Sequence, residues 1–279
     1  MECIRGTLHV AIDTNFNFVK DFSGRYKSIF FKYVCGKQGD TDCIIANIDQ
    51  NVEHTYYLVT ELISIFSYVH NVAYIPVGSS SDNYRGDLQL RDPGITRKKM
   101  LNFDLQGVSL VGDWIIFNYP HIITNEQSLL VRLYRKARTA EYFDDSASFL
   151  FYYHIIDYPY NNQQNCAEEY IDNFVAQKQP SHVIDLINEV NKDRVFEKEK
   201  KDSPLGTYLK FFVRDSIAHI VRNPRNAIKA HNLNIDCFNQ SKHLSNLNPL
   251  MREIARNKMM YKHEFNIQCE SDILQITIA

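Results

Sequence analysis

The first 120 residues alternate short apolar runs with turn residues, a pattern typical of β-strands joined by tight connections. One longer apolar stretch, at about 55–70, has helical spacing and predicts a single helix. The turn-rich segment GSSSDNYRGD (78–87) predicts an exposed loop. The predicted strands are GTLHVAI (6–12), SIFFKYVC (28–35), CIIANI (43–48), VAYIPV (72–77), LNFDLQGVSLVG (101–112) and DWIIFNY (113–119).

After Pro120 the apolar positions recur at helical spacing instead. Thr124 is expected to be the N-cap of the first helix, and Asp145 or Ser146 is expected to cap a second, almost wholly apolar helix. Ser181 is the expected N-cap of a later helix. Further helices are predicted at 164–177, 181–201, 204–222 and 244–262.

This change of pattern predicts an α+β protein with two domains. Residues 1–122 would form a β-rich N-terminal domain with one helix, and residues 123–279 would form an all-α domain. Near the end, the alternating apolar residues of DILQITI (272–278) favour a returning strand, with an irregular tail as the open alternative.

Composition narrows the class of protein. A length of 279 residues suits one large or two modest domains, and 44% hydrophobic with 23% charged residues is ordinary for a globular chain. No apolar run approaches the roughly 18 residues of a membrane span, and the first residues lack the pattern of a signal peptide. The six cysteines include no CxxC pair. We therefore predict a cytoplasmic protein with free thiols.

Familiar cofactor and metal motifs do not occur in the sequence. It contains no glycine-rich phosphate loop, no HExxH, no Cys/His pairs at zinc spacing and no GxSxG elbow. We predict neither a cofactor nor a metal. His154 and Asp157 could pair as a catalytic dyad, but on so apolar a helix a satisfied core histidine is the favoured interpretation.

Basic residues gather late in the chain. Residues 203–263 hold ten Lys/Arg and three Asp/Glu, a net charge of +7, whereas the net charge of the whole chain is −2. Such a segment could face phosphate groups, although a solvated helical face would have the same composition.

The same segment holds three arginine–histidine pairs with four to six residues between the partners: Arg214/His219, Arg225/His231 and Arg256/His263. Chance predicts roughly one or two such pairs, so spacing alone decides nothing. The pair in FFVRDSIAH (211–219) lies on the best amphipathic helix of this half. An arginine can bind a scissile phosphate bidentately, and a histidine, with an ordinary pKa near neutrality, can move the protons of RNA cleavage without metal.

Helical geometry places the pair's neighbours. Arg214 would lie opposite the apolar stripe, while Asp215, His219 and Arg222 would share its flank. The alternative is a surface ladder of Asp215, His219 and Arg222 with Arg214 merely solvated. The predicted stripe consists of Leu205, Leu209, Phe212, Val213, Ser216 and Ile220.

The segment FFVRDSIAHIVRNP (211–224), which follows the helices of LLVRLYRKARTAEYFDDSASFLFYYHIIDY (129–158), resembles HEPN-domain proteins. These are all-helical modules marked by an Arg, a polar residue and a His four to six residues on, here in an RX4H arrangement. The chain is also similar to bacterial methylamine-utilisation J-type proteins, through an "LYR.AR" helix, an aromatic "F..YY.I" helix and a later "RD.IAH". The likeness covers roughly residues 125–262.

The resemblance implies a HEPN-like bundle that dimerises and forms a composite, metal-independent endoribonuclease site, as in toxins of toxin–antitoxin pairs or antiviral-defence effectors. Arg214 would bind phosphate, Asp215 would fill the polar position and His219 would be the acid/base. Arg222, Arg225 and Arg256 would add RNA contacts. Asp215 departs from the usual asparagine and would repel phosphate unless it pairs with Arg222 or His219.

A different class of function stays open. The same helix could be an interface in a non-catalytic, HEPN-like dimerisation module that binds a protein or a ligand. RNA or nucleotide binding without turnover is a third possibility. An antitoxin or a regulatory ligand could act at the N-terminal domain, which resembles nothing we can name.

Overall fold

The computed structural model describes residues 6–14, 18, 21–36, 40–83, 122, 124–159, 167–192, 194, 203–219, 238–263 and 276–277. Contacts divide the chain into two compact units. The first unit contains residues 1–135 and 266–279, and the second contains residues 136–265. The first is built on an antiparallel sheet and the second on helices, so the α+β prediction is confirmed.

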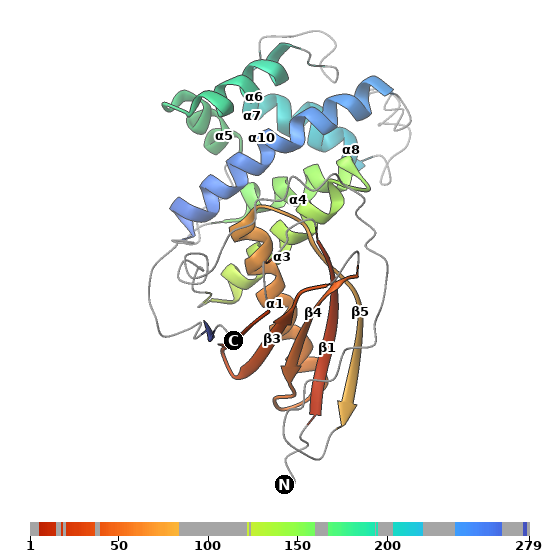
Figure 1. Ribbon diagram of the computed structural model, residues 1–279. Helices are drawn as coiled ribbons and strands as arrows, with labels where there is room; N and C mark the ends of the chain where they lie inside the picture. The colour runs from red at the N-terminus through yellow and green to blue at the C-terminus, as the bar shows by residue number, and fades with distance from the viewer. Residues whose placement is uncertain are drawn as a thin grey trace. The chain divides into compact units, whose positions relative to one another are not determined.

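The sheet of the first unit has the strand order β5-β1-β4-β3-β2-β6, and every neighbouring pair is antiparallel. Val10 and Tyr33 both lie opposite Ile44 in the register, and all three are fully buried. A 19-residue helix, α1 (Val52–His70), packs against the sheet (Figure 1). The strands are β1 (Gly6–Thr14), β2 (Phe22–Tyr26), β3 (Ile29–Val34), β4 (Asp42–Asn47), β5 (Tyr74–Asn83) and β6 (Ile276–Thr277).

Four predicted strands are present as β1, β3, β4 and β5, whereas two features differ from the prediction. The strand β2 was not expected. The loop predicted at 78–87 is wrong for Gly78–Asn83, because these residues form the second half of β5 and pair with Gly6–Ala11. The predicted strands at 101–112 and 113–119 lie outside the described residues. The expected returning strand near the end is present as β6, which pairs with β2.

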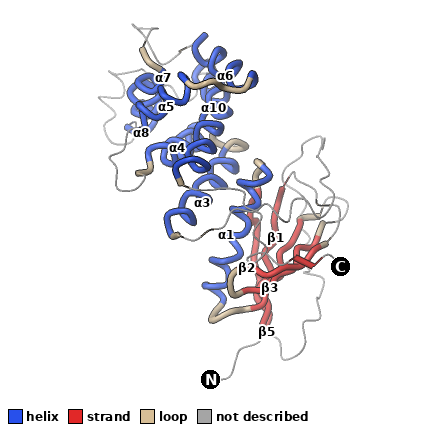
Figure 2. The backbone as a smooth tube through the Cα atoms, turned by 90° about the vertical axis from the view of Figure 1, so that its left-hand side faces the viewer, coloured by secondary structure: helices blue, strands red, loops and turns tan. Residues whose placement is uncertain are grey.

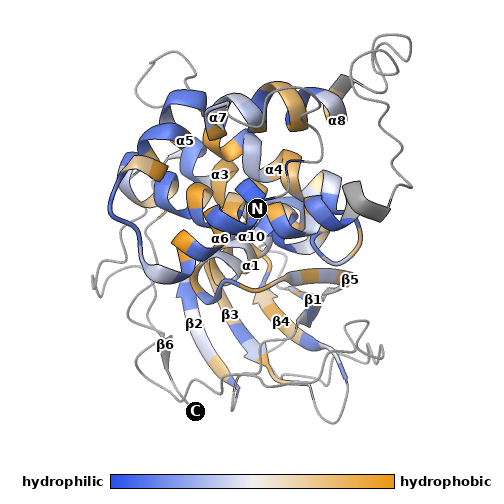
Figure 3. Cartoon of the chain, turned by 90° about the horizontal axis from the view of Figure 1, so that it is seen from above, coloured by the Kyte–Doolittle hydropathy of each residue, from blue (hydrophilic) through white to orange (hydrophobic). Residues whose placement is uncertain are grey.

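The second unit is helical. Its longest helix, α10, packs against α4 and α6, while α5 packs against α7 (Figures 1 and 2). Both hydrophobic and hydrophilic residues occur along its helices, as the colours of Figure 3 show. The helices after α1 are α3 (Asn125–Ala140), α4 (Asp145–Asp157), α5 (Ala167–Ala176), α6 (Ser181–Lys192), α7 (Leu205–Thr207), the π-helix η1 (Tyr208–Arg214), α8 (Asp215–His219) and α10 (Phe238–Lys262).

Within the described residues, no helix is both long and apolar enough to cross a membrane.

Two helix starts show how local hydrogen bonds fix the boundaries. The side chain of Thr124 accepts a hydrogen bond from the backbone of Gln127 at 3.1 Å, and the Gln127 side chain accepts one from the backbone of Thr124 at 3.2 Å. This capping box confirms the N-cap predicted at Thr124. At α4 the predicted N-cap, Asp145 or Ser146, is wrong. The N-cap is Asp144, whose side chain accepts hydrogen bonds from the backbone amides of Ser146 and Ala147.

The division between the units falls inside α3, between Arg135 and Lys136, whereas the sequence predicted a boundary at 122. The first half of α3 belongs to the first unit because side chains such as Arg132 contact α1. The last residues, predicted to belong with the helices, also group with the sheet through β6.

Candidate functional site

The segment that carries the Arg214–His219 pair is not one regular α-helix. It begins as the short helix α7, continues as the π-helix η1 and returns to α-helix in α8. The backbone amide of Asp215 accordingly donates to the carbonyl of Lys210, five residues back. A π-helical turn in a longer helix often accompanies a functional site, because it changes which side chains face outward.

The predicted buried stripe is largely confirmed. Leu205, Leu209, Val213 and Ser216 are buried, and Phe212 is half-buried. Tyr208, which the stripe did not include, is also fully buried. The remaining predicted member, residue 220, lies outside the described residues.

Arg214 lies at the end of η1 with 32% of its side chain exposed. Its Nη1 donates to Oδ1 of Asp215 at 2.6 Å, and its guanidinium lies 5.7 Å from the centroid of the Tyr153 ring on α4. The hydrogen bond to Asp215 raises the pKa of Arg214, so the side chain is a fixed cation. Burial raises the pKa of Tyr153, which keeps its hydroxyl neutral. The result is a half-exposed cation held by one carboxylate and one ring.

Asp215 forms an ion pair with its neighbour in the sequence, Arg214. The pairing with Arg222 or His219, which was predicted as the condition for phosphate binding, lies outside the described side chains. Asp215 is the first residue of α8 and directly follows Arg214, the last residue of η1. Any anion that bound to Arg214 would have to compete with this carboxylate for the guanidinium.

The other predicted site residues are described less fully. The backbone of His219 ends α8, while its side chain and the residues Arg222 and Arg225 lie outside what the structure describes. Arg256 is half-buried on α10. His154 has an exposed side chain, so the expectation of a satisfied core histidine there is wrong.

Contacts on both sides hold the helical segment in place. Tyr208 shares a buried hydrogen bond of 2.7 Å with His243 on α10. Lys210 forms an ion pair of 2.7 Å with Glu168 on α5. Gly206 lies so close to α5 that a Cβ there would stand 2.3 Å from the carbonyl oxygen of Glu168. These contacts define where Arg214 sits in the helical unit.

Residues 130–259 match a family model described as methylamine utilization protein MauJ. The matched region covers 130 of the 279 residues, a little under half of the chain, and it includes both Arg214 and His219. The predicted similarity to methylamine-utilisation J-type proteins is therefore confirmed for this region. Neither the curated proteins nor the solved structures contain a significant match.

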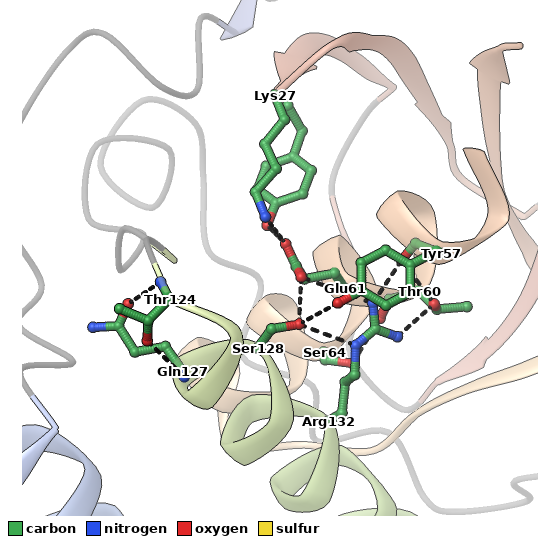
Figure 4. Close-up of polar contacts among 10 residues, drawn as sticks. Lys27, Tyr57, Thr60, Glu61, Ser64, Thr124, Gln127, Ser128 and Arg132 are labelled. Atoms are coloured by element: carbon green, nitrogen blue, oxygen red, sulfur yellow. Dashed lines mark hydrogen bonds and ion pairs between the residues drawn. The ribbon is translucent and has the colours of Figure 1, made fainter. Parts of the chain in front are cut away.

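A second polar cluster, which the sequence did not predict, lies in the first unit around Glu61. This carboxylate is fully buried on α1. It accepts hydrogen bonds from the Tyr26 hydroxyl and from Lys27, in the turn between β2 and β3, and another of 2.5 Å from Ser128 on α3 (Figure 4). Burial raises the pKa of Glu61, but hydrogen bonds from the three donors outweigh it and lower the pKa overall, so the group is ionised.

Arg132 extends this cluster along α3. Its Nη1 donates to Thr60 at 2.8 Å and its Nη2 to the carbonyl of Tyr57 at 2.7 Å. The guanidinium also lies 4.0 Å from the centroid of the Tyr57 ring and 3.8 Å from Glu61 (Figure 4). Arg132 is thereby held in one orientation by α1.

One sequence signal could have pointed to the Glu61 cluster. Glu61 is the single carboxylate within the apolar run YYLVTELISIF (56–66), and an ionised group in such a run requires partners. The partners themselves could not have been named, because Lys27 and Ser128 are far from Glu61 in the sequence. Among the residues that the structure describes, no group of three His, Cys, Asp or Glu side chains is arranged to bind a metal ion.

Proposed function

We propose that this protein is a metal-independent endoribonuclease of the HEPN type, acting through Arg214, Asp215 and His219. The observation that carries the proposal is the half-exposed guanidinium of Arg214, placed at the end of a π-helix inside the MauJ-like region. The net charge of +7 over residues 203–263 supports a phosphate-bearing substrate. Such an activity would suit a toxin or an antiviral-defence effector.

The chemistry needs no cofactor. The 2′-hydroxyl of RNA attacks the adjacent phosphorus, the bond to the 5′ oxygen breaks, and the products are a 2′,3′-cyclic phosphate and a 5′-hydroxyl. Arg214 offsets the negative charge that grows on the phosphate oxygens. His219 takes the 2′ proton or donates a proton to the leaving 5′ oxygen.

Helix geometry bears on how the pair could act. Positions five apart on a regular α-helix are rotated by about 140° from each other, so we expect one chain not to present both groups to the same phosphate. A composite site, with Arg214 from one copy and His219 from a second, would bring the two groups to one phosphate. The proposal therefore includes a homodimer.

Asp215 supports a second candidate function. Because Arg214 already has a carboxylate partner at 2.6 Å, it could serve an interface and not a substrate. The protein would then be a non-catalytic dimerisation module that binds a protein or a ligand. In that case Arg214→Ala would weaken the dimer, and no RNA would be cleaved.

The deciding experiment incubates the purified full chain with labelled structured and unstructured RNA in EDTA. Wild type is compared with Arg214→Ala, His219→Ala and the double variant, while Arg25→Ala removes an exposed arginine of the first unit as a matched control. Circular dichroism and size exclusion follow fold and oligomeric state.

We expect wild type and Arg25→Ala to leave 2′,3′-cyclic phosphate ends, and the other three variants to lose at least a hundredfold in rate. Cleavage that survives in a folded double variant would sink the assignment. Folded wild type that cleaves neither RNA, beside an Arg214→Ala protein that dissociates, would favour the interface function.

A further inference from the structure

Two cations contact the carboxylate of Glu61 in the first unit, and a third follows them on α3. Lys27 donates a hydrogen bond to Glu61, and Nη2 of Arg132 lies 3.8 Å from Oε2 of Glu61. Arg135 lies one helical turn after Arg132 on α3, which places the two guanidinium groups on the same side of the helix. Two positive charges are therefore in excess over the negative charge of Glu61.

Arg135 differs from Arg132 in its partners. Its Nε donates to the hydroxyl of Ser64 on α1 at 3.0 Å, and Ser64 in turn donates to the carbonyl of Thr60 at 2.6 Å. No carboxylate pairs with Arg135 in the part of the chain that the structure describes. A guanidinium has five N–H donors, so four of them have no protein acceptor among these residues.

Two neighbouring hydrogen bonds thus join α1 and α3. Thr60 on α1 accepts from Arg132, and Ser64, one turn further along α1, accepts from Arg135. Burial and the nearby charge of Arg132 lower the pKa of Arg135 to about 10. A cation that is partly desolvated beside a like charge is costly unless an anion offsets it.

We propose that Arg135 and Arg132 form a binding site for a terminal phosphate group, a phosphate monoester of a small molecule, on the first unit between α1 and α3. The excess of two positive charges matches a monoester, which carries close to two negative charges at neutral pH. A phosphodiester or a carboxylate carries only one. The planar fork of Arg135 offers the paired donors that phosphate oxygens accept.

The surroundings fit a ligand larger than phosphate alone. Tyr56 and Tyr57, in the first turns of α1, have 39% and 45% of their surface exposed. The guanidinium of Arg132 already lies over the ring of Tyr57, 4.0 Å from the ring centroid. A sugar or a base attached to the phosphate could contact these rings. The inference does not depend on ribonuclease activity, because the site lies in the unit that lacks Arg214.

The test uses the full chain in a phosphate-free buffer of low ionic strength. Inorganic phosphate, ribose 5-phosphate, adenosine 5′-monophosphate and adenosine are titrated by calorimetry, and the same probes are followed by thermal unfolding. The variants are Arg135→Gln, Arg135→Lys, and Arg25→Gln as an exposed arginine of the same unit that contacts the Lys27 carbonyl.

We expect the probes with a phosphate to bind wild type and Arg25→Gln, and adenosine not to bind. Affinity should fall at least tenfold in Arg135→Gln and less in Arg135→Lys, which keeps the charge but loses the fork. Tighter binding of the nucleotide than of ribose 5-phosphate would identify a nucleotide as the source, and equal binding would identify the phosphate group itself as sufficient.

Stability without ligand separates a binding residue from a structural one. Arg135→Gln loses the hydrogen bond to Ser64 but also removes a partly desolvated charge that has no carboxylate partner among the described residues, so the variant should unfold at about the same temperature as wild type when no probe is present. A clear fall in its unfolding temperature, unchanged affinity in that variant, or no saturable binding of any probe by wild type would each overturn the proposal.

Discussion

Arg214 illustrates how much a single contact changes the meaning of a motif. Its spacing to His219 is visible in the sequence, but its partner is not. The hydrogen bond of 2.6 Å to Asp215 occupies one edge of the guanidinium. At the residue scale, then, the proposed binding of an anion by Arg214 depends on Asp215.

Replacing Asp215 with asparagine tests this competition. Asp215→Asn should bind RNA more tightly than wild type, by threefold or more, because Arg214 loses its charged partner and the repulsion of phosphate disappears. Since the pair is partly exposed, the free energy of unfolding should change by less than about 1 kcal/mol. Fluorescence anisotropy with labelled RNA in EDTA measures the affinity.

Asp185→Asn removes an equal charge from an exposed position on α6 and is the matched control. If both variants bind RNA with the same affinity, the effect is one of net charge and the direct competition is absent.

At the scale of an element, the segment 205–219 shows where helical periodicity stops being informative. The sequence predicted one helix at 204–222, and most of the described residues of the apolar stripe are buried. The π-helix η1 was not predicted, because hydrophobic spacing alone does not distinguish one inserted residue from normal drift of the stripe. The close packing of α7 on α5, which Gly206 permits, also depends on residues outside the segment.

Gly206→Ala tests that packing. Because the new methyl group would stand 2.3 Å from the Glu168 carbonyl oxygen, α5 and α7 would have to move apart, at a cost of roughly 1–3 kcal/mol in the free energy of unfolding. Urea unfolding followed by circular dichroism measures this.

Gly78→Ala on β5 is the matched control, since a Cβ at that position meets no atom within 4 Å. Equal stability of the two variants would show that α5 and α7 separate without cost.

At the scale of the whole molecule, buried ionisable groups link stability to pH. The ring of His70, at the end of α1, stacks on Phe66 with centroids 6.0 Å apart and shares a hydrogen bond of 2.6 Å with the Tyr74 hydroxyl. Burial lowers the pKa of His70 from 6.5 to about 3. The folded protein therefore keeps this ring neutral where the unfolded chain would protonate it.

Acid should accordingly destabilise the protein in a defined window. Between pH 6.5 and about 3 the unfolded chain binds the additional proton at His70, so the free energy of unfolding falls as pH falls, by up to about 1.4 kcal/mol for each pH unit. His70→Gln should show a shallower dependence over the same window. Urea titrations at several pH values measure the slope, with His154→Gln, which removes an exposed histidine, as the control. Identical slopes in wild type and His70→Gln would contradict the assignment.

The sequence by itself determined the α+β class, the approximate positions of the helices and the cap at Thr124. Those features follow from hydrophobic spacing and from hydrogen bonds that span three residues, so they are local. It also identified the MauJ-like region and the residues Arg214, Asp215 and His219 as candidates.

Only the tertiary structure decided which distant groups meet. Glu61 and Ser128 are 67 residues apart in the chain, and Arg135 and Ser64 are 71 apart, so no local pattern could pair them. The same holds for Gly78–Asn83, whose polar residues look like a loop until β1 supplies hydrogen-bond partners for the backbone. The spacing of apolar side chains indicates which face of one helix or strand is buried. Which residues of different elements contact each other depends on how the chain folds back on itself.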